Sequence, residues 1–207
     1  MYIPPHFRVE ELDAIHTLAH ENPFATLVTA FEGVPFASHV PFLLETEAGS
    51  QGTLFTHLAR ANPQVEALAS GAETLVIFQG AHAYISPQWY TVSPSVPTWN
   101  YAVVHAYGKA RVLEAEEFAG FMQRLLAVYE GENSPPLPED YFHKMLGGIV
   151  GFEIEVARWE GKWKMSQNRS EEDRERVAAA LEAQQGDANS LAVAEGVRVR
   201  RAGRIVL

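Results

Sequence analysis

Residues 24–57 read FATLVTAFEGVPFASHVPFLLETEAGSQGTLFTH, and this stretch decides the fold class. Its runs Phe24–Ala30, Val34–Leu44 and Gly52–His57 are rich in the β-branched and aromatic residues that strands favour. Short breaks at 32–33 and 47–50 carry turn-forming residues. Parallel strands would need a long crossover between them, so these brief turns predict antiparallel pairing. The stretch therefore favours a barrel or sandwich, and we expect the barrel.

Further elements extend the pattern on both sides of this stretch. Apolar spacing and capping residues predict helices over 9–20, 62–68, 114–129, 140–146 and 170–185. Runs of β-favouring residues predict further strands over 73–78, 83–86, 100–113 and 151–158. The sum is mainly β with helices (α+β), with six or seven strands. We expect one domain over 1–185 and a C-terminal extension of uncertain structure over 186–207.

Composition restricts the functional classes. The 207 residues suffice for one good core, and 47% apolar with 20% charged residues is ordinary for a soluble globular protein. No apolar run is long enough for a membrane span, and the first residues lack the layout of a signal peptide, so we expect a cytoplasmic protein. The absence of cysteine excludes disulfides, thiolate metal sites and a cysteine nucleophile. The eight scattered histidines suggest no metal site.

The net charge of −10 argues against the broad basic surface that direct DNA binding needs. The local exception is the stretch 197–207, which carries arginines without any acidic residue: Arg198, Arg200, Arg201 and Arg204. A solvated tail or an edge strand explains it most simply, and a nucleic-acid contact is the alternative. No run is typical of a helix-turn-helix.

Two segments offer groups that suit an anion. In the segment 55–63 a strand end leads through a short turn into a helix start, so that Thr56, Arg60 and backbone N–H groups can converge. An ordinary capped helix is the alternative. In the second segment Ser38 and His39 stand next to Pro41, which belongs at a strand edge or bulge, and both could meet a ligand or simply face solvent.

Two other segments combine aromatic or polar side chains. The aromatic clusters at 83–90 and 96–101 suit stacking on a planar ring, filling a subunit interface, or pinning their own loop. The run Lys164–Arg169 is dense in donors and suits carbonyl or phosphate oxygens, or is a plain surface loop. No Gly-rich phosphate loop, HExxH motif or nucleophile elbow occurs, and no catalytic residue is identified.

Taken in order, four motifs resemble the PaiB-type family of FMN-binding proteins, often described as negative transcriptional regulators. They are MYIPPHF at 1–7, AYISPQWY at 83–90, VPTWNY at 96–101 followed by Val104-His105 and Gly108, and KMSQN at 164–168. The resemblance spans roughly residues 1 to 175. It implies an antiparallel split β-barrel like that of the pyridoxamine-phosphate oxidase group, in which two protomers hold two flavins at their interface.

The resemblance also implies a phosphate site. In the wider group a strand ending in Phe-x-Thr leads to a Ser/Ala-Arg-Lys turn that holds the FMN phosphate, and Phe55, Thr56, Ala59 and Arg60 match it. Ala61 replaces the usual lysine, and the preceding strand, with Ser38 and His39, lacks the arginine and lysine often found there. Either Lys164 and the backbone compensate for these losses, or FMN binds loosely.

We therefore expect FMN as cofactor, a homodimer, and a regulatory role linked to flavin or redox state that acts indirectly on DNA. The expected cofactor-binding residues are Ser38, His39, Thr56, His57, Arg60, Asn62, Trp99, Asn100, Tyr101, Lys164 and Gln167. An FMN-dependent oxidoreductase is the first alternative. The second is a haem-binding split barrel, with His39, His57 or His105 as candidate ligands.

Overall fold

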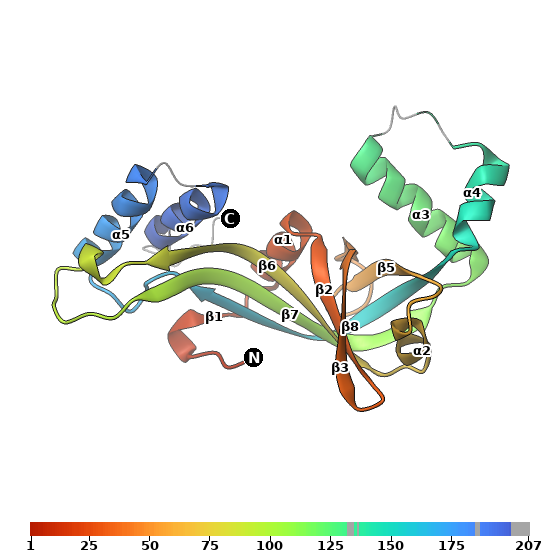
Figure 1. Cartoon of the computed structure of the whole chain (residues 1–207), viewed down its shortest axis with the longest axis horizontal. Helices are drawn as coiled ribbons and strands as arrows, with labels where there is room; N and C mark the ends of the chain where they lie inside the picture. Colours follow the sequence, from red (N-terminus) through yellow and green to blue (C-terminus); the bar gives the residue numbers. More distant parts are fainter. Residues whose placement is uncertain (132–134, 136, 185–186, 200–207) are drawn as a thin grey trace. The chain divides into compact units, whose positions relative to one another are not determined.

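A computed structural model describes residues 1–131, 135, 137–184 and 187–199 (Figure 1). Its strands follow one another in the sheet in the order β3-β2-β6-β7-β8-β5-β4, and β1 pairs with β8. They are β1 (Arg8–Val9), β2 (Phe24–Phe31), β3 (Val34–Pro41), β4 (Leu43–Glu45), β5 (Thr53–Ala59), β6 (Glu73–Ile85), β7 (Thr98–Val112) and β8 (Ile149–Lys164). The pairs β1–β8, β2–β3, β2–β6, β4–β5 and β5–β8 are antiparallel, as predicted.

Short helices lie between and after the strands, which confirms the α+β class. They are α1 (Leu12–Glu21), α2 (Gln64–Ala69), α3 (Ala115–Glu130), α4 (Glu139–Leu146), α5 (Glu171–Ala183) and α6 (Ala188–Val199), with 3₁₀ turns η1 (Pro5–Phe7) and η2 (Pro87–Trp89). Within the described ranges no helix combines the length and apolarity that crossing a bilayer requires.

The chain forms two compact units. Unit 1 comprises residues 1–22, 78–105 and 160–207, and unit 2 comprises 23–77 and 106–159. Strands β6, β7 and β8 contribute residues to both units. The expected site residues from Ser38 to Asn62 belong to unit 2, whereas those from Trp99 to Gln167 belong to unit 1.

The β2–β3 hairpin of unit 2 owes its tight turn to local chemistry. Phe31 pairs with Val34, and the two residues between them, Glu32 and Gly33, have φ values of 51° and 78°. A two-residue turn with both central residues at positive φ matches the right-handed twist of the strands it joins. The register that follows places Leu27 opposite Ser38 and Thr26 opposite His39.

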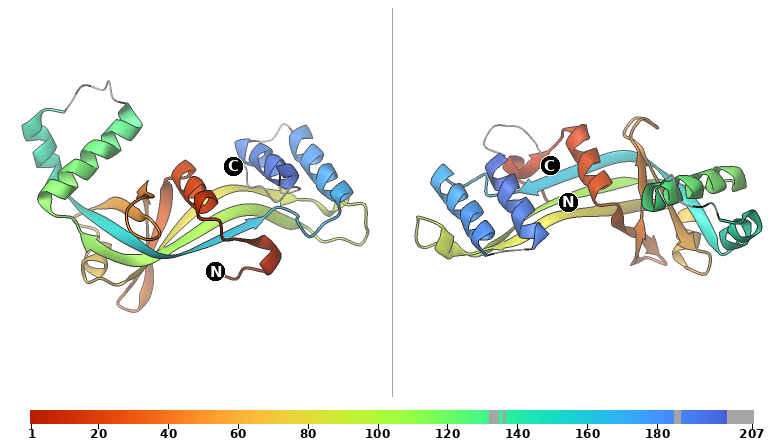
Figure 2. Two further views of the ribbon diagram at one scale, coloured as in Figure 1. Left: turned by 180° about the vertical axis from the view of Figure 1, so that it is seen from behind. Right: turned by 90° about the horizontal axis from the view of Figure 1, so that it is seen from above.

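Helix α3 closes the core of unit 2 from one side. Its buried residues Phe118, Phe121 and Leu125 pack with Phe55 and Leu113. Strand β8 has a glycine beneath the helix, where a Cβ on Gly151 would lie 2.2 Å from the ring of Phe118. Helices α3 and α4 form a pair beyond the ends of the strands (Figure 2).

Unit 1 has its own helices. Helix α1 buries Leu18 and Ala19, and α5 and α6 lie side by side (Figures 1 and 2) and bury Val177, Leu181 and Val193. Helix α6 falls inside the predicted C-terminal extension, and its Arg198 forms exposed ion pairs with Glu175 and Glu182 on α5. The expectations for Arg200, Arg201 and Arg204 lie outside the described residues.

The structure joins two of the predicted strands and divides a third. The segments 73–78 and 83–86 are one strand, β6, because Gly80 serves close packing and not a turn: a Cβ there would lie 3.1 Å from Leu18 Cδ1. The strand predicted over 34–44 is divided into β3 and β4 at Phe42, which is buried and donates its N–H to Pro23 O.

Candidate functional site

The start of α2 meets the edge of β3 in unit 2 through two expected site residues. Asn62 Nδ2 donates to Ser38 Oγ at 2.9 Å, and Asn62 Oδ1 accepts from the N–H of Gln64 at 2.9 Å. One amide side chain therefore closes the turn that leads into the helix and binds the strand. The helix is only six residues long, so side-chain donors, and not a helix dipole, define what this rim can bind.

His39 and His57 lie in different environments. His39 is exposed beside Ser38, and its Nδ1 is 3.1 Å from Thr26 Oγ1. His57 is half-buried, and its ring lies 6.3 Å from that of Phe121. Burial lowers the pKa of His57, and no donor or acceptor in the described part of the chain reaches its buried Nδ1. His39 is thus a candidate for ligand contact, whereas His57 is held neutral by its surroundings.

Thr56 and Arg60 are both engaged within the chain. Thr56 is fully buried and donates its hydroxyl to Pro41 O at 2.8 Å. Arg60 is exposed, and its Nε and Nη2 donate to Gly147 O at 2.8 Å and Ile149 O at 3.0 Å. The guanidinium therefore holds the connection from α4 to β8. The contact of Arg60 with a phosphate stays a prediction. Nη1, which makes neither of these two bonds, would have to donate to the phosphate.

Exposed aromatic rings gather on unit 1. Trp99 on β7 is 53% exposed and Tyr84 on β6 is 47% exposed, and their rings meet edge-on at 6.0 Å. The ring of His82 lies 6.3 Å from that of Trp99. Large aromatic surfaces left open to solvent suit a planar ligand or a second protein surface.

Lys164 supports this aromatic group from β8. Its Nζ donates to Thr98 Oγ1 and, at 2.7 Å, to Trp99 O. Burial lowers the pKa of Lys164, and the positive charges of Lys162 and Arg169 lower it further. An anion placed near these three cations would relieve their mutual repulsion.

The remaining expected residues of unit 1 differ in burial and in hydrogen bonding. Tyr101 shares the face of Trp99, and its ring centroid lies 5.1 Å from Lys162 Nζ. Asn100 points to the other face, is 1% exposed, and donates to Ser166 Oγ at 2.9 Å. Gln167 accepts from Met165 N and donates to Trp163 O, both at 2.6 Å.

Sequence reasoning missed two residues that the structure ties to these groups. Ser166 has a left-handed φ of 60° although it is not glycine, and Asn100 holds its hydroxyl. Gln64 is fully buried beside Asn62 and reaches across to β2 and β3. The signal for Gln64 was a polar residue on the same helix face as Ala67 and Leu68, which are also buried.

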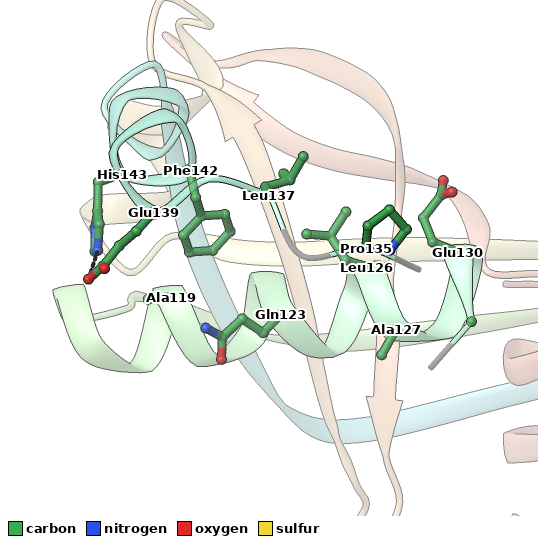
Figure 3. A pocket seen from close by; sticks show the side chains of 11 residues that line it. Ala119, Gln123, Leu126, Ala127, Glu130, Pro135, Leu137, Glu139, Phe142 and His143 are labelled. Atoms are coloured by element: carbon green, nitrogen blue, oxygen red, sulfur yellow. Dashed lines mark ion pairs between the residues drawn. The ribbon is translucent and has the colours of Figure 1, made fainter. Parts of the chain in front are cut away.

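A cleft of about 640 Å³ lies between α3 and α4 in unit 2 (Figure 3). Its floor is apolar, with Leu126, Leu137 and Phe142, and Glu130 and Glu139 lie on its rim. The carboxylate of Glu139 is 3.9 Å from the imidazole of His143. Carboxylates without a lysine or arginine among the lining residues repel a phosphate dianion, so this cleft does not suit FMN.

The donor set on the β3–α2 rim does suit a phosphate. The Ser38 hydroxyl and the Asn62 amide, which bind each other, can both donate to phosphate oxygens, whereas the exposed imidazole of His39 leaves β3 on the opposite face. The aromatic group around Trp99 suits the flavin ring. Over the described ranges, no group of three acidic or histidine side chains gathers as metal ligands would.

Comparisons with known proteins bear on the family and the cofactor. Residues 1–158 match a family described as "Putative FMN-binding domain". Protease synthase and sporulation protein PAI 2 of Bacillus subtilis (strain 168) is 40% identical over 187 residues, which cover 88% of this chain and 89% of that protein. An uncharacterized protein of Emericella nidulans is 31% identical over 227 residues, covering 88% and 90%.

Two solved structures share the fold. The FAD and heme binding protein from Mycobacterium smegmatis has a TM-score of 0.63 at 17% identity, covering 88% of this chain and 82% of its own. The flavocytochrome Anf3 from Azotobacter vinelandii has a TM-score of 0.62 at 16% identity, covering 83% and 77%. The predicted split-barrel fold is confirmed.

Proposed function

Because this chain belongs to the family of FMN-binding domains, we propose that it is a dimeric, flavin-linked regulator that holds FMN between two copies of itself. FMN is its cofactor, and the split barrel is its fold. We propose three further points: which residues hold the flavin, that the protein is a dimer, and that its role is regulatory.

The observation that carries the proposal is the hydrogen bond between Asn62 and Ser38. It joins the start of α2 to an exposed strand edge and leaves the Ser38 hydroxyl proton available to an anion. We assign the FMN phosphate to Ser38 and Asn62, with Arg60 as a further contact, and keep His39 as a separate prediction because its side chain leaves β3 on the face opposite Ser38. Neutral donors hold a phosphate less tightly than charged ones, so FMN binds in reversible equilibrium, as a sensor requires.

Within unit 1, we propose that Trp99 and Tyr101 contact a flavin ring, with Lys164 bound to Trp99 O beside them. Exposed aromatic surface on unit 1 supports both ring stacking and a subunit contact. When bound, FMN supplies reversible electron or hydride acceptance, and the chain supplies shape and polarity around it.

The regulatory role is supported by the Bacillus subtilis relative, whose name, Protease synthase and sporulation protein PAI 2, refers to sporulation. The net charge of −10 makes an indirect effect on transcription the better proposal than direct DNA binding. A gel-shift titration against genomic fragments at physiological salt tests this point, since tight specific retardation would contradict it.

The test of flavin binding uses the purified full chain. We expect oxidised-flavin absorption after incubation with FMN and desalting, and a dimer mass by light scattering. A Soret band instead would identify haem, and a monomer that retains stoichiometric FMN would contradict a site shared by two copies. Anaerobic bleaching by NADH or NADPH, followed by reoxidation with a substrate, would indicate an oxidoreductase.

A further inference from the structure

Gln64 is a fully buried glutamine at the first position of α2. Its Nε2 lies 3.1 Å from Leu27 O, 3.2 Å from Thr29 Oγ1 and 3.4 Å from Phe36 O. Within the described part of the chain its Oε1 has no donor, although it is buried. A buried amide with an unpaired oxygen costs stability that an apolar side chain of similar size would not.

The partners of Gln64 are the backbone positions that place Ser38. Leu27 is directly opposite Ser38 in the β2–β3 hairpin, and Thr29 is directly opposite Phe36. From the start of α2, Gln64 therefore binds two rungs of the hairpin that are separated by the Val28–Ala37 pair. Two residues earlier, Asn62 binds the Ser38 side chain.

The two amides together fix the strand edge relative to residues 62–64. Asn62 alone holds a side chain that can rotate, whereas Gln64 holds the backbone from which that side chain projects. A methionine at position 64 would fill the same volume but could not hold the Leu27 and Phe36 carbonyl oxygens.

We propose that Gln64 is a positioning residue for the FMN phosphate. It acts through Ser38 and Asn62 without touching the ligand, and the proposal rests on the phosphate assignment made above. Only the part of the FMN affinity that comes from the phosphate should depend on how Gln64 positions Ser38 and Asn62.

The test is the Gln64→Met variant of the full chain, with Gln123→Met on the exposed face of α3 as matched control. Dissociation constants for FMN and for riboflavin, which lacks the phosphate, come from flavin fluorescence titrations. We expect the ratio of the riboflavin constant to the FMN constant to fall about tenfold in Gln64→Met, with the riboflavin constant unchanged. The ³¹P resonance of bound FMN should shift in the same variant, and Gln123→Met should match the wild type.

Two outcomes separate this inference from the proposed function. If the wild type binds riboflavin as tightly as FMN, the phosphate assignment fails. If the wild type discriminates and Gln64→Met discriminates equally, or weakens both ligands by one factor, Gln64 is only structural and the inference is overturned.

Thr29→Val keeps the test decisive if Gln64→Met does not fold. It removes one partner of the Gln64 amide and leaves the glutamine in place. A smaller fall in the same ratio supports the positioning role, and an unchanged ratio contradicts it.

Discussion

Asn62 connects the fold to the phosphate assignment, and two substitutions there separate the two roles. Asn62→Ala removes the turn bond to Gln64 N and the bond to Ser38 Oγ. At about 1 kcal/mol for each, the free energy of unfolding should fall by about 2 kcal/mol. Asn62→Asp keeps the acceptor for Gln64 N, and aspartate closes this kind of turn as asparagine does, so its unfolding free energy should stay within about 1 kcal/mol of wild type.

FMN affinity should follow the opposite order. Asn62→Ala loses one neutral donor and should weaken FMN about tenfold. Asn62→Asp places a carboxylate where we assign a phosphate dianion, so it should weaken FMN more than Asn62→Ala does while remaining the more stable protein. Riboflavin affinity should change little in both.

Urea unfolding followed by tryptophan fluorescence measures the stabilities, and flavin fluorescence titration at constant salt measures the affinities. The reasoning is refuted if Asn62→Asp binds FMN as tightly as the wild type. A carboxylate next to the phosphate would repel it, so unchanged affinity would mean that the phosphate does not lie beside residue 62. A proportional loss of stability and FMN affinity in both variants would mean that Asn62 serves the fold alone.

Three further predictions concern the other groups. Arg60→Ala should weaken FMN binding about tenfold to hundredfold without unfolding the chain. It should also speed hydrogen exchange in residues 147–149, because the Arg60 side chain binds the carbonyl oxygens of Gly147 and Ile149. Unchanged FMN affinity would remove Arg60 from the site. Trp99→Ala should weaken FMN and riboflavin alike, by about tenfold, in fluorescence titrations, and a loss confined to FMN would contradict a role in ring stacking. Burial lowers the pKa of His57 below its ordinary 6.5, so below about pH 6.5 the unfolded chain binds more protons than the folded chain and the free energy of unfolding falls as the pH drops. In urea unfolding between pH 7.5 and 5.5, His57→Gln should show a smaller fall than the wild type. An equal fall in the variant would mean that other groups cause the pH dependence.

Much of the fold was predictable because its signals are local. Glu32-Gly33 between two β-rich runs specified a tight hairpin, and the helical spacing of Phe118, Phe121 and Leu125 specified the buried face of α3. The continuous β6 was not predictable, because a glycine in a strand that serves close packing resembles one that forms a turn. Only Leu18, 62 residues away in the chain, reveals which role Gly80 has.

The candidate site was predictable as a set of residues but not as a set of contacts. The motifs named Ser38, Asn62 and Arg60, yet nothing local indicated that Asn62 would bind Ser38 or that Arg60 would bind the carbonyl oxygens before β8. Gln64 was missed because its partners lie on strands that precede it by 28 to 37 residues.

By itself the sequence determined the class of the fold, the β2–β3 turn, the family and its cofactor, since composition, periodicity and ordered motifs are properties of the chain read in one dimension. Tertiary structure alone decided which donors are neighbours, which remain available to a ligand, and which buried amide aligns them. Those properties depend on strand register and helix placement, because a hydrogen bond requires two groups to meet within about 3 Å from positions far apart in the chain.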